Sequence, residues 1–193
     1  MPHPQRTSAA ITAASTFFRV FEIICGGIIV GILAYYQHRV DKAPDGRQSA
    51  RILYSLIIGC VGLIWSLLAI SLFKLASFHL LLDFILFAGW IVAFALLVNL
   101  TANDDICSSS WFAHYWAYYW GGWWSYFLDD LAISIPIGYA PGCASWQTVL
   151  AFLFIGAVVF LCSAVVGCAT LLTRLSERRS RRDTRKPEQD GPV

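Results

Sequence analysis

The chain has 193 residues, of which 58% are hydrophobic and 13% are charged, and its mean hydropathy is +0.61. A soluble globular domain is about half apolar and about a quarter charged, so this composition excludes an ordinary soluble protein. The net charge of +2 says little by itself. The distribution of the charges says more, because they gather at the chain ends and in loops.

Four long apolar runs remain between the charged segments, and each exceeds the roughly 18 residues that suffice to cross a membrane. They predict an all-α membrane protein, a four-helix transmembrane bundle, as a single domain over residues 17–173. The tails, 1–16 and 174–193, are expected to be flexible and disordered, respectively, since they are polar and low in apolar periodicity. The expected spans are residues 17–36, 52–73, 78–100 and 149–173.

The basic residues predict the orientation of these spans. Ten of the 14 Lys and Arg residues lie in the two tails, at the head of the first span and in the hairpin between the second and third spans. The other four lie in the first loop, where Asp41 and Asp45 offset them in part. By the positive-inside rule both termini are expected in the cytoplasm. The long second loop is then extracellular or lumenal, in the plasma membrane or in secretory or endosomal membranes.

The first apolar run is interpreted as a retained span. A cleaved signal peptide has an apolar region of roughly 7–15 residues, whereas this run is longer, contains Glu22 and ends in Tyr35 and Tyr36. Such paired aromatic residues are typical of a membrane interface.

Small residues recur at helical spacing in the first, second and fourth spans. They let helix backbones approach closely in lipid, where no hydrophobic force draws helices together. We expect them to pack the bundle, with contact between copies of the chain as the alternative. The residues are Gly27, Gly31, Gly59, Gly62 and Gly167.

Polar residues inside the spans form a second candidate site. Arg19 and Glu22 are three residues apart and share a helix face, and Asp83 has His79 one turn before it, with Lys74 near enough to extend toward it. An acid in a membrane usually faces the bundle or pairs with a base. The interpretation is a structural polar contact, with a proton or ion relay as the alternative. The third span offers no further polar position before Asn99, which favours the structural contact.

The long loop, residues 101–148, contains an aromatic segment, WFAHYWAYYWGGWWSYF, over 111–127. Such rings favour the headgroup level of a membrane. The segment predicts one or two short helices on the outer leaflet, and an aromatic cradle for a ligand or sterol is the alternative. The tryptophans expected at the lipid interface are Trp111, Trp116, Trp120, Trp123 and Trp124.

Six cysteines fall into two groups. Cys107 and Cys143 are the two that lie in the long loop, which faces an oxidising compartment in the expected orientation. They predict a disulfide bond that closes a loop of about 36 residues. The other four lie inside spans, where cysteine acts as a small apolar residue.

The C-terminal tail is strongly basic. A basic cluster next to the cytoplasmic end of a span fits binding to anionic inner-leaflet lipids, and a simple topology anchor is the equal alternative. The residues are Arg178, Arg179, Arg181, Arg182 and Arg185.

The usual catalytic sequence motifs are missing. The sequence has no phosphate-binding glycine loop, no H-E-x-x-H and no G-x-S-x-G, and the four histidines are scattered. We therefore expect no enzyme, no catalytic or metal-binding residues, no cofactor and no nucleic-acid partner.

The membrane part, from about Ser15 to Leu175, resembles the MARVEL-domain proteins, in particular the compact fungal members. The resemblance rests on four spans with a long second outer loop, on Arg19 at the head of the first span, on Asp83 early in the third, and on Cys143 just before the fourth. The aromatic segment 111–127 and Glu22 do not belong to that pattern. The first loop is short and lacks cysteine, unlike that of claudins, and the long loop lacks the Cys-Cys-Gly of tetraspanins.

The resemblance implies a non-enzymatic membrane protein that organises lipid domains, membrane appositions or vesicle traffic. Its expected partners are membrane lipids, sterol or anionic inner-leaflet lipid among them, and further copies or other membrane proteins. The alternatives are a small ion or proton channel or transporter, and an accessory subunit of a membrane complex.

Overall fold

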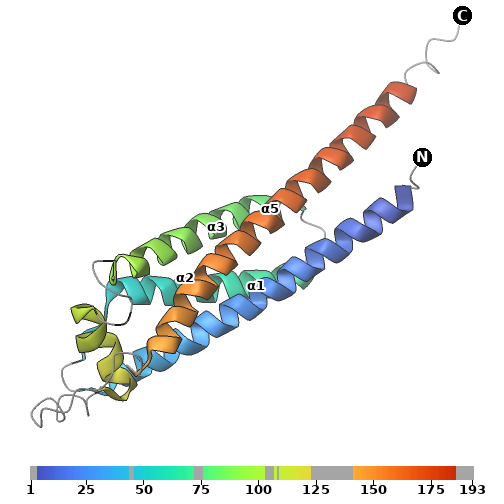
Figure 1. The fold of residues 1–193 in the computed structure, drawn as a ribbon. Coiled ribbons are helices and arrows are strands. Elements are labelled where there is room, and N and C mark those ends of the chain that lie inside the picture. Colours follow the sequence, from blue (N-terminus) through green and yellow to red (C-terminus); the bar gives the residue numbers. More distant parts are fainter. Residues whose placement is uncertain are drawn as a thin grey trace, which may run out of the picture.

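The computed structural model describes residues 4–43, 46–71, 76–102, 107, 109–122 and 141–185, and this part of the chain is helical apart from its turns (Figure 1). Its elements are α1 (Pro4–Asp41), α2 (Ala50–Ser71), α3 (Ala76–Val98), a short wide helix of the π type, η1 (Phe112–Gly122), and α5 (Cys143–Arg185).

The four long helices each contain a segment long and apolar enough to cross a membrane. This confirms the predicted all-α, four-span fold. Helices α2 and α3 have 22 and 23 residues, which matches the roughly 20 residues that a hydrocarbon core of about 30 Å requires. Helices α1 and α5 are longer, with 38 and 43 residues, so each continues beyond the span.

The helices form a closed ring in which each packs against two neighbours, in the order α1, α2, α3, α5 and back to α1. The Pro4 end of α1 and the Arg185 end of α5 project from the same end of the bundle, beyond α2 and α3 (Figure 1). The element η1 lies against the opposite end, where it contacts α1.

Both tails differ from the expectation. Residues 4–16 and 174–185 continue α1 and α5 as helix instead of forming flexible or disordered tails. Alanine, arginine and glutamate have high helix propensity, and a helix that already exists in the membrane extends without a new nucleation step. Residues 1–3 and 186–193 lie outside the described part of the chain.

The middle of the bundle is built around the fully buried indole of Trp90 on α3. A Cβ atom on Gly62 of α2 would lie 2.9 Å from the indole Nε1, and one on Gly156 of α5 would overlap the six-membered ring. Phe160 of α5 completes this layer, with its ring centroid 5.5 Å from that of Trp90. Glycine is therefore the residue that lets the indole fit between two helices.

The other expected packing glycines divide into two groups. A Cβ on Gly59 would lie 3.2 Å from Ile29 of α1, and one on Gly167 would lie 3.6 Å from Leu80 of α3. Gly27 and Gly31 instead lie on the exposed side of α1, and nothing lies within 4 Å of a Cβ on Gly31. The close approach of α1 to α2 occurs at Gly26, where a Cβ would lie 3.0 Å from Leu63 Cβ. Contact between copies through Gly27 and Gly31 stays a prediction.

Gly156→Ala should destabilise the bundle by about 1–3 kcal/mol, because the added methyl group forces Trp90 out of its position. Gly31→Ala is the matched control: it makes the same change in a span, in open space, and gains the same helix propensity. The free energies of unfolding of both variants, measured in detergent or lipid discs, test this. Equal stabilities for the two variants would contradict the tight indole layer.

Candidate functional site

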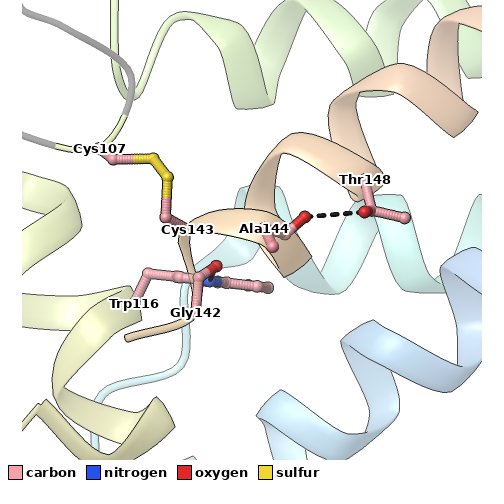
Figure 2. The surroundings of a disulfide bond; sticks show 6 residues. All are labelled: Cys107, Trp116, Gly142, Cys143, Ala144 and Thr148. Carbon is pink, nitrogen blue, oxygen red and sulfur yellow. Dashed lines mark hydrogen bonds between the residues drawn. A yellow bond between two sulfur atoms is a disulfide. The ribbon is translucent and has the colours of Figure 1, made fainter. Parts of the chain in front are cut away.

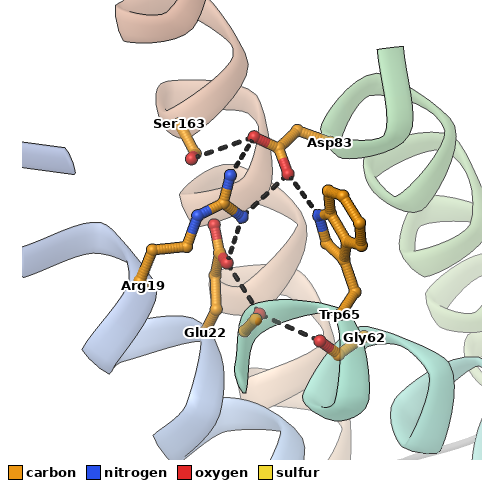
Figure 3. A network of polar contacts seen from close by, with 7 residues as sticks. Arg19, Glu22, Gly62, Trp65, Asp83 and Ser163 are labelled. Atoms are coloured by element: carbon orange, nitrogen blue, oxygen red, sulfur yellow. Dashed lines mark hydrogen bonds and ion pairs between the residues drawn. The ribbon is translucent and has the colours of Figure 1, made fainter. Parts of the chain in front are cut away.

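A buried ionic cluster joins α1 to α3, about two turns after the start of α3 (Figure 3). The guanidinium of Arg19 on α1 donates to both carboxylate oxygens of Asp83 on α3, at 2.8 Å to Oδ1 and 2.5 Å to Oδ2. Its Nη1 also donates to Oε2 of Glu22 at 2.7 Å. Arg19 therefore binds two acids, one on its own helix and one on the helix diagonally across the ring.

Helices α2 and α5 complete the cluster. The indole Nε1 of Trp65 donates to Asp83 Oδ1 at 2.8 Å, and the Ser163 hydroxyl donates to Oδ2 at 3.2 Å (Figure 3). The Ser66 Oγ lies 2.7 Å from Glu22 Oε2 and 2.9 Å from the carbonyl oxygen of Gly62. All four spans thus supply a group to one polar centre.

The charged side chains of the cluster are shielded from the surroundings. The exposed fractions are 6% for Arg19, 0% for Glu22 and 2% for Asp83. Planar guanidinium and carboxylate groups match each other in a two-bond pair, which is the strong form of the charge-assisted hydrogen bond. In lipid such a pair is needed, because an unpaired ion there is costly.

The sequence predicts part of this cluster. The contact between Arg19 and Glu22 follows from their spacing, and it is present. Asp83 pairs with Arg19. Lys74 and the side chain of His79, which were expected near Asp83, lie outside the described residues. The expectation missed this pair because the rotation of α1 relative to α3 is a tertiary property.

Three further members of the cluster carried no signal of their own in the sequence. Ser66 and Ser163 look like small packing residues in a span, and Trp65 looks like any aromatic residue of a membrane helix. Each becomes recognisable as a donor once the helices are placed around Asp83.

The α3 side of the core beyond this cluster is apolar. On α3 the buried positions that follow Asp83 are Leu86, Trp90, Ala93 and Leu97. Among the described residues, no group of three histidine, cysteine, aspartate or glutamate side chains is placed to hold a metal ion. Other helices contribute buried polar side chains to the core, among them Gln37 on α1 and Ser55 on α2.

An aromatic cap covers the far end of the bundle. The ring of Trp116 in η1 stacks on Tyr36 of α1 with a centroid distance of 4.5 Å and meets Trp146 of α5 edge to face at 4.8 Å. Its Nε1 donates to the carbonyl oxygen of Gly142 at 2.9 Å. Gly142 has a φ of +79°, and a Cβ there would lie 2.7 Å from Trp120 Cγ, so both backbone and space require glycine.

The predicted disulfide between Cys107 and Cys143 is confirmed (Figure 2). It joins the segment after α3 to the first residue of α5, with a Cα–Cα distance of 5.6 Å and a sequence separation of 36. The bond therefore ties the base of the long loop to the helix that follows it.

Trp116 is fully buried inside the cap, and Trp111 and Trp120 are half-buried, in ring contact with Trp146 and Tyr35, respectively. The exposed rings of η1 are Tyr115 and Tyr118. Trp123 and Trp124 lie outside the described residues.

The basic cluster of the C-terminal tail, Arg178, Arg179, Arg181, Arg182 and Arg185, lies on the last turns of α5. The structure describes the backbone of these residues and not their side chains.

The chain matches no family model, no curated protein and no solved structure. The fold and the two sites therefore define its class: an all-helical membrane protein with four candidate spans and one disulfide bond.

Arg19→Gln should lower the free energy of unfolding by about 3–5 kcal/mol, because it leaves the buried Asp83 without its cation. Arg39→Gln is the matched control, since Arg39 lies on the same helix but is exposed, and its Nε donates to the Tyr119 carbonyl at 3.2 Å. That variant should lose no more than about 1 kcal/mol. Similar losses in both, by reversible unfolding in detergent, would contradict the central role of Arg19.

Removal of the disulfide by Cys107→Ser with Cys143→Ser should cost up to about 4 kcal/mol, since the bond closes a loop with a sequence separation of 36. The partly buried Cys60, changed to Ser, is the control for removing a free thiol from the protein. We expect the double variant to expose the long loop to protease first, with α1 to α3 still protected. An unchanged protease pattern and stability would show that the cap holds without the bond.

Proposed function

We propose that this protein is a non-enzymatic membrane organiser, which gathers lipids and other membrane proteins around a rigid four-helix body. The observation that carries the proposal is an interior filled by side chains at three levels. These are the ionic cluster around Arg19, the glycine-bound indole of Trp90, and the aromatic cap around Trp116. A bundle packed in this way favours binding of lipids and proteins at its outer surface.

Several regions of the outer surface suit the binding of lipids and other proteins. Large apolar side chains on the outside of the spans, such as Phe84, Ile64 and Val165, are more than half exposed and suit contact with lipid chains. The exposed face of α1 with Gly27 and Gly31 suits close approach of another helix. The arginines at the end of α5 would add attraction to anionic headgroups if that end faces the cytoplasm, as we propose from the charge distribution.

These features support the classes of activity that the resemblance to MARVEL-domain proteins implies: the formation of lipid domains, membrane apposition or vesicle traffic. The partners proposed are membrane lipids, including sterol or anionic lipid, and further membrane proteins. The setting proposed is the plasma membrane or the secretory or endosomal membranes.

A small proton or ion transporter is the second candidate, and the buried acids Glu22 and Asp83 favour it. A transport path needs polar groups at successive depths. The buried positions that follow Asp83 on α3 are apolar, which supports the organiser over the transporter.

Reconstitution into giant vesicles with coexisting ordered and disordered lipid phases separates the two candidates. The organiser should partition selectively into one phase or change the domains, while a dye inside the vesicles shows no proton flux above that of empty vesicles. Equal distribution between the phases, or a flux above the empty-vesicle level, would contradict the proposal.

Two variants show which part of the molecule acts. Replacing the five arginines of the basic cluster with glutamine should reduce binding to vesicles of anionic lipid, if these residues serve the organiser. Asp83→Asn should leave partitioning unchanged in protein that remains folded. A flux present in the natural protein and lost in Asp83→Asn would assign a transport path to the ionic cluster.

A further inference from the structure

The ionic cluster contains two carboxyl groups and one guanidinium group. With both acids ionised its net charge would be −1, in a site where the exposed fractions of the three side chains are 6% or less. The neighbouring members, Trp65, Ser66 and Ser163, are neutral. An unbalanced charge in such a place is costly, so the hydrogen bonds should reveal how the balance is reached.

Asp83 is surrounded by donors. Its Oδ1 accepts from Arg19 and Trp65, and its Oδ2 accepts from Arg19 and Ser163. A proton on Oδ1 would point at the N–H groups of Arg19 and Trp65, which cannot accept it. A proton on Oδ2 could be donated only to the Ser163 hydroxyl, and it would weaken the two-bond pair with Arg19. Asp83 is therefore the ionised acid and the partner that balances Arg19.

Glu22 has a different environment. Its Oε1 is buried and has no hydrogen-bond partner among the described residues, although an ionised oxygen in the interior needs donors. Its Oε2 lies 2.7 Å from Ser66 Oγ, and that hydroxyl also lies 2.9 Å from the Gly62 carbonyl oxygen. A serine hydroxyl has one hydrogen and cannot donate to both.

We propose that the cluster is a proton-binding site, in which the Glu22 carboxyl holds one proton and donates it to Ser66 Oγ. The serine hydroxyl then donates its own hydrogen to the Gly62 carbonyl, so both short contacts are hydrogen bonds. The charges balance, since Arg19 carries +1, Asp83 carries −1 and Glu22 is neutral. The unpartnered Oε1 becomes the carbonyl oxygen of a neutral acid, which is the form that tolerates burial best.

A proton suits this site better than a metal cation. Hard cations such as Ca²⁺ take about 6–8 oxygen ligands, whereas the cluster offers one free carboxyl oxygen, on a group already bound to a guanidinium. The other titratable groups described on the helices around Glu22 include the thiols of Cys25 on α1, Cys60 on α2 and Cys162 on α5, none of which can carry a positive charge. The side chain of His79 lies outside the described residues, so the test below includes a variant at that position.

This inference goes beyond the proposed function, because an organiser of lipids needs no bound proton. Infrared difference spectroscopy on the full-length protein in lipid, at pH 7 in H₂O and D₂O, tests it directly. We expect the C=O stretch of a protonated carboxyl group, lost in Glu22→Gln and shifted to higher frequency in Ser66→Ala, which removes its hydrogen-bond partner. The same band should persist in His79→Gln.

A second measurement keeps the test independent of folding. Glu22→Gln replaces one neutral group with another and should shift Tm by less than about 2 °C, whereas Asp83→Asn, which breaks the ionised pair, should lower it by on the order of 10 °C. Absence of the band in the natural protein would overturn the proposal. So would a band that survives Glu22→Gln, or a Glu22→Gln variant that unfolds as readily as Asp83→Asn.

Discussion

The pairing of Arg19 with Asp83 is the interaction on which the rest of the bundle depends. It joins α1 to α3 across the ring, between helices that are not neighbours, and it draws donors from α2 and α5 to the same point. In lipid the hydrophobic effect does not hold helices together, so a directed contact that all four share has more influence than it would have in water. It sets the depth of each helix and the face that each turns inward.

Two apolar features continue that arrangement along the bundle. Trp90 follows Asp83 by about two turns on α3, and its indole fits because α2 and α5 present glycine on either side. At the far end Trp116 fills the space over Tyr36, and the disulfide holds the start of α5 beside the segment that follows α3. Each helix contributes to at least two of these levels, so a rotation of any one helix would disturb more than one level. The interior is therefore specified by the polar pair, the indole layer and the cap acting jointly.

The sequence predicts the features that the bilayer and the local chemistry determine. Span number and length follow from hydrocarbon thickness, and the disulfide follows from two cysteines in one loop. The rotation of each helix about its own axis is determined by contacts between helices, so it cannot be predicted from the sequence. Gly31 and Gly62 have similar surroundings in the sequence, yet the first is exposed and the second contacts Trp90. For the same reason the sequence favours the lipid interface for Trp116, which is buried in the cap, and it does not indicate that Asp83 pairs with Arg19.

The remaining problem posed by the cluster is the presence of Glu22. Arg19 and Asp83 alone form a neutral pair in which the carboxylate has two donors beyond the arginine. A second acid therefore adds nothing to charge balance, and it would cost desolvation whenever it was ionised. Glutamine at this position would bond Ser66 equally well without that cost. A carboxyl group, unlike an amide, can release a proton. The structural requirement of the bundle is met by Asp83, and Glu22 is the residue of the cluster whose chemistry is left free for a change of state.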